Sequence, residues 1–374
     1  MRRLLCIGLL AAVAAGAGAQ GPVSAADEND PRSPWSFNFR AEAEVRYDDN
    51  VLGLSDTEIR SMRRLEEPEN DERFRIETPN DVIFNPLVGF GVYRKPPRGL
   101  DTAFGASIGT NQYLRNTVKD YHEYRLWVRQ QLNHSRAHRT TLGVGGTRIP
   151  SYFLRQLVDD DISAPPNTCN TSDPNDLCHE AATFQLTTGY LELTQEVVDK
   201  YLSAELRYAR ERRDYNHEFD ERDADSDVWS IQVNIHPTGG IGFRLRPYYE
   251  HERRTTRGDP GTSSTITEDD AGFDGDMIGL EARGLWGADA DHRNTLRGYY
   301  QRERRDFTSD DPNDTGHFGR EDRITKFGIG YGRELGPHFR LNVSAYHRDN
   351  DVSTSSSTFA RNVVAFSIGY ESAR

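Results

Sequence analysis

The chain has 374 residues, of which 35% are hydrophobic, with a formal net charge of −13 and a mean hydropathy of −0.77. Past the N-terminus it has no apolar run of about 18–20 residues, which excludes a helical membrane protein. Its acidity excludes nucleic acid as a partner, because binding to phosphates needs a basic footprint. A β-barrel remains open, since a barrel spreads its apolar residues over every second position of each strand.

The N-terminus has the features of an export signal. Residues 1–19 combine a basic start, an apolar core at 4–15 and an A-x-A cleavage site that ends at Ala19. We therefore predict a signal peptide at 1–19. Residues 20–35 are polar and contain prolines, which indicates a disordered periplasmic lead before a barrel domain at 36–374.

Alternation by twos begins at Trp35 and continues to Asn50. Apolar side chains occupy the odd positions, while Arg40, Glu42 and other polar side chains occupy the even positions. Successive side chains of a strand point to opposite faces, so this pattern predicts a strand with one apolar and one charged face. A strand that crosses a bilayer needs about 9–11 residues, and this one is longer. Its aromatic residues cluster at both ends, as interfacial girdles require.

The same alternation recurs along the whole chain. Strands are predicted at 81–93, 100–113, 121–133, 138–148, 182–197 and 201–214, followed by seven more in the C-terminal part. Residues 51–80 and 149–179 are interpreted as long polar loops, because they have too few apolar positions for a buried helix. The connections after odd strands are mostly long and acidic, and those after even strands are mostly short.

This rhythm predicts an all-β fold, a transmembrane up-and-down antiparallel β-barrel of about 14 strands. Short periplasmic turns and long extracellular loops are typical of barrels in the outer membrane of Gram-negative bacteria. We therefore expect outer-membrane lipid and lipopolysaccharide as surroundings. A soluble sandwich or a β-solenoid would explain the alternation, but it would not explain the strand length, the girdles or the loop rhythm.

Two cysteines remain after the signal segment, Cys169 and Cys178. An even pair close in sequence in an exported protein predicts a disulfide, which would close a small loop within 149–179. A metal site is a poorer interpretation, because no CxxC is present and only His179 lies alongside.

The first strand ends in Tyr47-Asp48-Asp49-Asn50-Val51 and leads into a meander of strands rich in arginine and tyrosine. With the signal peptide, this stretch resembles the porin-like outer-membrane barrels associated with exopolysaccharide or capsule secretion. The resemblance covers most of residues 36–374. It implies a passive conduit or an accessory of polysaccharide export machinery, and it supplies no catalytic residues. One departure is the C-terminus, where Tyr370 stands four residues before the end of the chain.

The charged face of the strands is the main candidate site. Arginine suits bidentate contact with carboxylates and tyrosine suits stacking, so the face predicts a lumen for a saccharide or a small polar solute. The alternative is that arginine and glutamate pair with each other and only brace the wall. The predicted lumen-lining residues are Arg40, Glu42, Glu44, Arg46, Arg125, Arg129, Glu205, Arg207, Arg244, Arg246, Glu250, Arg297, Glu303 and Arg340.

An acidic loop is the second candidate. Asp311, Asn313, Thr315 and Asp322 occupy positions 1, 3, 5 and 12 of an EF-hand-like loop, with Gly316 at position 6. The spacing suggests a weak Ca²⁺ site, while a solvated acidic loop without metal is the alternative. No other cofactor is expected.

Three functions follow from these patterns. The favoured one is a porin-like channel or export accessory. The second is a plugged barrel that acts as an adhesin or scaffold through its acidic outer loops. The third is an enzyme at the rim using a histidine such as His217 or His317, but no motif surrounds either residue, so we expect no enzyme and no catalytic residues.

Overall fold

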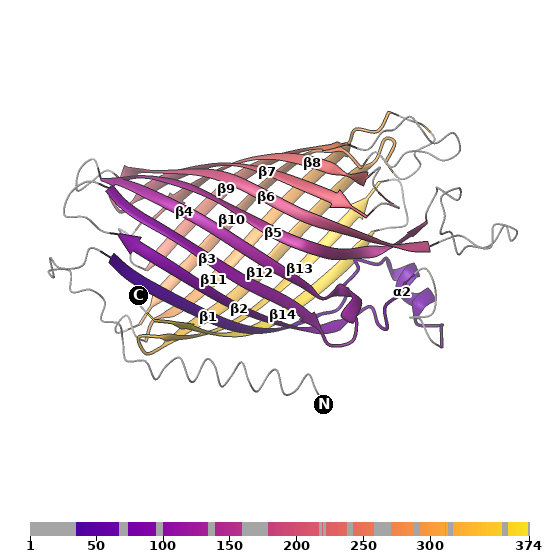
Figure 1. Cartoon of the computed structure of the whole chain (residues 1–374), viewed down its shortest axis with the longest axis horizontal. Coiled ribbons are helices and arrows are strands. Elements are labelled where there is room, and N and C mark those ends of the chain that lie inside the picture. Colours follow the sequence, from indigo (N-terminus) through magenta and orange to yellow (C-terminus); the bar gives the residue numbers. More distant parts are fainter. Residues whose placement is uncertain are drawn as a thin grey trace, which may run out of the picture.

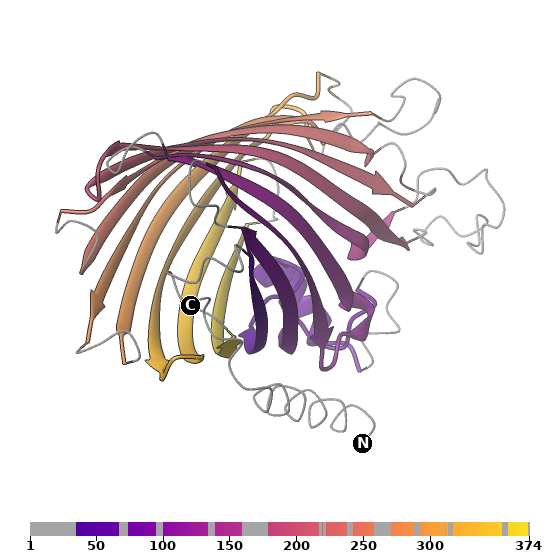
Figure 2. The same cartoon turned by 60° about the vertical axis from the view of Figure 1, so that its left-hand side comes forward.

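The computed structural model describes residues 35–66, 74–94, 100–133, 139–158, 179–216, 219, 222–237, 242–257, 271–287, 292–310, 312, 317–353 and 358–372. Fourteen antiparallel strands follow one another around a closed barrel, in which the first strand pairs with the last (Figures 1 and 2). The predicted fold is therefore confirmed. Among the described residues, no helix combines the length and apolarity needed to cross a membrane. The predicted signal peptide, Cys169 and Cys178 lie outside the described residues.

The strands are long, as the sequence predicted. Their bounds are β1 (Trp35–Asp48), β2 (Asp81–Arg94), β3 (Leu100–Tyr113), β4 (Tyr121–Asn133), β5 (Arg139–Val158), β6 (His179–Val198), β7 (Leu202–Tyr215), β8 (Ala224–Ile235), β9 (Phe243–Thr256), β10 (Phe273–Trp286), β11 (Asn294–Phe307), β12 (Glu321–Leu335), β13 (Phe339–Val352) and β14 (Phe359–Glu371).

The two faces of the barrel differ in chemistry because cross-strand partners share a face. Outside, large apolar side chains such as Leu126 and Trp229 are 67% and 58% exposed, while the inward Asp48 and Glu281 are almost fully buried. Aromatic side chains gather where odd strands begin and even strands end, including Trp35 and Trp286. Short turns lie at this same end, which is the periplasmic end in outer-membrane barrels.

The fifth strand was predicted ten residues too short. β5 continues past Arg148 to Val158 and pairs with a β6 that begins at His179, so the connection within 149–179 is shorter than expected. The register shifts between Ile149 and Tyr152 and again between Phe153 and Arg155. These bulges interrupt the alternation by twos, which is why the pattern did not reveal the extension.

The segment between β1 and β2 was predicted to be a loop without a helix, and this was wrong. It contains α2 (Asp56–Met62), which starts with a capping box formed by Ser55 and Glu58. Met62 is buried, and the helix lies at the end of the barrel opposite the start of β1 and the end of β14 (Figure 1). We call residues 51–66 and 74–80 the mouth segment.

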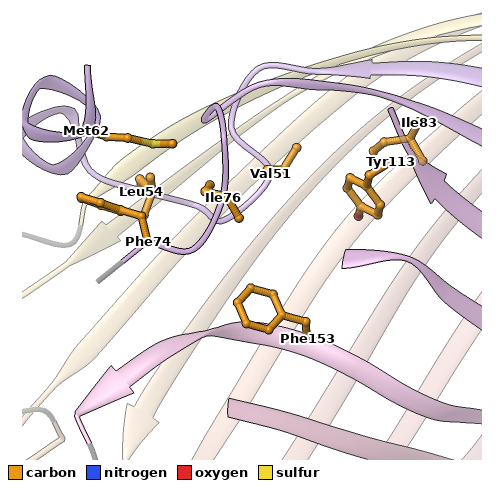
Figure 3. Packing of buried hydrophobic residues seen from close by; sticks show 8 residues of the cluster. All are labelled: Val51, Leu54, Met62, Phe74, Ile76, Ile83, Tyr113 and Phe153. Atoms are coloured by element: carbon orange, nitrogen blue, oxygen red, sulfur yellow. The ribbon is translucent and has the colours of Figure 1, made fainter. Parts of the chain in front are cut away.

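The mouth segment folds onto the inner wall. Figure 3 shows one hydrophobic cluster in which side chains of the mouth segment meet side chains of β2, β3 and β5. Its members are Val51, Leu54, Met62, Phe74, Ile76, Ile83, Tyr113 and Phe153. The apolar residues of the segment are few, but their partners on the wall complete a core that the local sequence does not contain.

The stretch that carried the family resemblance closes the barrel. Asp48 is fully buried and receives a bidentate contact from Arg361 of β14, with Nε 3.0 Å from Oδ1. Asp49 accepts two hydrogen bonds of 2.7 Å from the backbone and side chain of Asn362. Asn50 donates to the carbonyl oxygens of Leu54 and Ala360. These contacts join the two ends of the sheet and start the mouth segment.

We predict that Asp48→Asn destabilises the folded barrel by about 3–5 kcal/mol, because it leaves the Arg361 guanidinium without its buried carboxylate. The measurement is urea unfolding of the protein refolded in detergent, followed by heat-modifiable mobility.

Asp49→Asn is the matched control, since Asp49 is partly exposed and its partner is neutral. We expect a change of about 1 kcal/mol there. Equal destabilisation by the two substitutions would contradict the closing role of Asp48.

Candidate functional site: the charged inner wall

The register places all fourteen predicted lumen residues on the face opposite the apolar one. Arg246 faces Glu281 across β9 and β10, for example, and Glu205 faces Gln232 across β7 and β8. Whether this face passes a solute stays a prediction.

Many of these side chains pair with neighbours on the wall. Arg40 contacts Glu42, Arg129 lies 3.6 Å from Glu192, and Glu303 contacts Arg305. Such pairs fit the alternative in which opposite charges brace the wall. Buried charges need partners, so pairing of this kind is expected wherever strands bring both signs together.

One side of the wall is hollowed. A cavity of about 470 Å³ is lined by inward side chains of β7 to β13. Its polar and aromatic lining includes Glu205, Arg207, Ser230, Gln232, Arg246, Tyr248, Glu250, Glu281, Arg297, Tyr299, Gln301, Lys326, Ser344 and Tyr346. The set combines carboxylates, cations, amides, hydroxyls and aromatic rings, which are the groups that hold polar solutes.

The strongest electrostatic feature of the cavity is Glu281 on β10, whose side chain is 3% exposed. Its Oε1 lies 2.9 Å from Arg244, while its Oε2 lies 2.6 Å from Arg246 and 2.5 Å from Arg297. Arg283 is the cross-strand partner of both Arg244 and Arg297. We call these four arginines and Glu281 the arginine cluster.

Glu281 was not among the predicted site residues, although the alternation had placed it on the charged face. The sequence shows the face of a residue, but it does not show which residues of neighbouring strands lie beside it. Only the register brings Arg244, Arg246 and Arg297 around this one carboxylate.

Two tyrosines of the cavity lie against glycines on the neighbouring strand. A Cβ atom at Gly279 would collide with the ring of Tyr248, and one at Gly328 would lie 2.7 Å from the ring of Tyr299. Glycine in a strand often marks a close approach of this kind. The rings therefore lie against bare backbone, and both tyrosines line the cavity.

Farther toward the mouth, charged side chains stack on aromatic rings instead. The Arg254 and Arg305 guanidinium groups lie 4.5 and 4.7 Å from the ring centroid of Phe273, which is 1% exposed. Arg254 also lies 2.8 Å from Glu252. This part of the wall is filled and paired, which suits a bracing role.

The mouth segment covers the opposite side of the barrel interior. Its wall contacts come from β2, β3 and β5, whereas the cavity is lined by β7 to β13. In Figure 2 the helix lies within the ring of strands at that end. The cavity thus lies along the wall that holds the arginine cluster, away from the strands that the mouth segment contacts.

The connection between β3 and β4 holds the mouth segment in place through hydrogen bonds. Asp81 accepts a hydrogen bond of 2.8 Å from the backbone of Asn116, and Asn116 accepts one of 2.9 Å from the backbone of Glu77. Lys119, in the short helix η2 (Thr117–Lys119), is 2% exposed and donates to the Phe153 carbonyl oxygen at 3.0 Å. Its ammonium also lies over the ring of Tyr152.

The predicted Ca²⁺ loop lies mostly outside the residues that the structure describes. Asp311, Asn313 and Thr315 of the predicted Ca²⁺ loop lie outside the described residues, and Asp322 binds Arg320 at 2.7 Å. No three His, Cys, Asp or Glu side chains gather as a metal site would need within the part of the chain that the structure describes. The Ca²⁺ site stays a prediction.

Of the two histidines considered for a rim enzyme, the structure describes His317 but not His217. His317 is 8% exposed and packs 5.2 Å from the ring of Phe307, whereas His217 lies outside the described residues. The contact of His317 with an aromatic ring suits packing.

A closed 14-strand barrel with an apolar outer face and a charged interior defines the chain as a porin-like outer-membrane β-barrel. No protein-family model matches the sequence, and no curated protein matches it.

Among solved structures, the chain is similar to a Pseudomonas aeruginosa FadL homologue, with 8% identity and a TM-score of 0.44, covering 90% of this chain and 89% of that one. It is also similar to an anion-selective porin from Comamonas acidovorans, with 8% identity and a TM-score of 0.41, covering 90% of this chain and 99% of that one. A third similar structure is a bacterial polysaccharide outer membrane secretin, with 8% identity and a TM-score of 0.39, covering 88% of this chain and 97% of that one. At these values the similarities carry no argument about function.

The burial of Lys119 makes the stability of the folded state depend on pH. Burial lowers the pKa of its ammonium group to about 7, and the charge of Arg361 lowers it further, while Asp48 acts in the opposite direction. In the unfolded chain the pKa is about 10.4, so between these values the unfolded state holds the extra proton. The contribution of Lys119 to stability therefore rises as the pH rises through this window.

We predict that the stability of Lys119→Met relative to the wild type is highest at or below pH 7. From pH 7 to 10 the stability of the wild type should rise relative to that of the variant. The measurement is the difference in thermal unfolding midpoint between the two proteins in detergent across this range. Lys200→Met, at an exposed lysine in the turn between β6 and β7, is the control, and its difference from the wild type should stay constant with pH. A difference that stays constant with pH would contradict a neutral, buried Lys119.

Proposed function

We propose that the protein is a passive outer-membrane channel, or an accessory of polysaccharide export, that passes a saccharide or a small polar solute. The observation that carries this proposal is the cavity of about 470 Å³ along β7 to β13, with its cations, amides and glycine-seated tyrosines. Sugars present both hydroxyl groups and apolar ring faces, which amides and aromatic rings can bind together.

The resemblance of the Tyr47–Val51 stretch supports the export context. In the structure this stretch joins β1 to β14 and closes the sheet, so the shared residues indicate a shared barrel architecture. A polysaccharide export machinery as partner, and the exopolysaccharide itself as solute, are therefore parts of the proposal that rest on the resemblance.

The mouth segment favours a second candidate function. Because it packs onto the inner wall through a hydrophobic cluster, the protein suits a plugged barrel that binds partners through its outer loops. The two functions differ in one property, which is whether the space beside the mouth segment is continuous.

We predict that the purified protein conducts ions in planar bilayers, and that replacing residues 55–77 with a short glycine-serine link raises the single-channel conductance severalfold. The physical reason is that pore conductance grows with the open cross-section. Maltotriose and other neutral sugar oligomers should reduce the wild-type current while they occupy the cavity.

A variant that lacks residues 160–178 is the control, since it removes an outer connection outside the mouth segment. It should conduct like the wild type. A wild type that seals the membrane while the mouth-segment variant conducts would support the plugged barrel, and sealed membranes from both would refute the channel.

A further inference from the structure

The arginine cluster has an unusual charge arrangement. Arg244, Arg283 and Arg297 are direct cross-strand partners on β9, β10 and β11, and like charges in that position repel each other. With Arg246 there are four guanidinium groups around Glu281, the one carboxylate that the described contacts bring into the cluster. The cluster therefore favours a second anion.

The donors of the cluster are not used up by Glu281. The Nε atoms of Arg244, Arg246 and Arg283 are buried and have no hydrogen-bond partner among the described residues. A guanidinium group has five N–H donors, and a buried donor without a partner is costly. Of these three arginines, Arg246 lines the cavity, so a ligand there that brings carboxylate oxygens would satisfy its open donor.

The two oxygens of Glu281 face different surroundings. Oε2 contacts Arg246 and Arg297, which both line the cavity, while Oε1 contacts Arg244, which does not belong to the cavity lining. A solute carboxylate arriving from the cavity meets Arg246 and Arg297 first. Glu281 can keep its contact with Arg244 while it gives up the other two.

We propose that the arginine cluster is an exchange site for carboxylates carried on a ring, in which the solute carboxylate replaces Glu281 on Arg246 and Arg297. This inference rests on the proposed channel, whose solute class it narrows. The ring of the solute packs beside Tyr248 or Tyr299, which both line the cavity next to Arg246 and Arg297.

Exchange also explains why a channel would keep a carboxylate among its arginines. A solute that meets four bare guanidinium groups would bind tightly and leave slowly, whereas conduction needs binding weak enough to release. Because Glu281 competes for the same two arginines, one ion pair forms as the other breaks. Glu281 thus lowers the affinity and shortens the residence time of the solute.

Binding to the full-length protein in detergent tests the proposal without requiring conduction. The probes are trigalacturonate, benzoate and maltotriose, measured by calorimetry. A carboxylate probe should bind and maltotriose should bind more weakly. Arg246→Gln and Arg297→Gln should each weaken binding of the carboxylate by about tenfold or more. Glu281→Gln should tighten it about tenfold, since the competitor is gone while its volume stays.

Glu303→Gln is the matched control. It makes the same charge change on the same wall, but Glu303 pairs with Arg305 outside the cluster. It should leave the affinity within about twofold. Tyr299→Leu should weaken the ring-bearing probes and leave acetate, a carboxylate without a ring, unchanged. Trigalacturonate binding without benzoate binding identifies a sugar acid as the solute, and the reverse identifies a carboxylate that is not a sugar.

The proposal is overturned if no carboxylate binds the wild type, if Arg246→Gln leaves binding unchanged, or if Glu281→Gln weakens it in a protein that keeps its heat-modifiable mobility. The last result would make Glu281 a bracing residue only. Sealed bilayers together with carboxylate binding would refute the channel and leave the binding site standing. Conduction without carboxylate binding would refute the site and leave the channel.

Discussion

The pairing of the first strand with the last is the interaction on which the rest of this structure depends. A sheet exposed to lipid can have no free edge, because unpaired backbone groups have no water to bind there. The contacts Asp48–Arg361 and Asp49–Asn362 join residues 313 positions apart in the chain and complete the ring. Once the ring is closed, one face of every strand meets lipid and the other is turned inward.

Closure has an electrostatic consequence. Each inward position carries its charge into a confined space, so the wall must balance charges locally between adjacent strands. In most places it does so with arginine–glutamate pairs or by stacking arginine on rings, as around Phe273. The arginine cluster differs, since three cross-strand arginines share one carboxylate with a fourth. This imbalance is the basis of the proposed carboxylate site.

The interior is also divided in shape. The mouth segment packs on the side made by β2, β3 and β5 with a small hydrophobic core, and the cavity of about 470 Å³ follows β7 to β13. Gly279 and Gly328 leave room on the wall for the rings of Tyr248 and Tyr299, because a Cβ atom at either glycine would collide with the ring beside it. The cavity and the arginine cluster share Arg246, Glu281 and Arg297, so a solute in the cavity reaches the cluster directly.

The sequence by itself determined the strands, their number and the face of each side chain, because the alternation by twos is local and is enforced at every position by lipid on one side. It therefore predicted that Arg246 and Arg297 share the inner face. It could not predict the extension of β5, because two bulges shift the alternation. Nor could it predict the mouth segment's core, because the partners of Leu54 and Met62 come from distant strands. Only the tertiary structure decided that three arginines meet at Glu281, since the register between strands depends on barrel closure and not on any one strand.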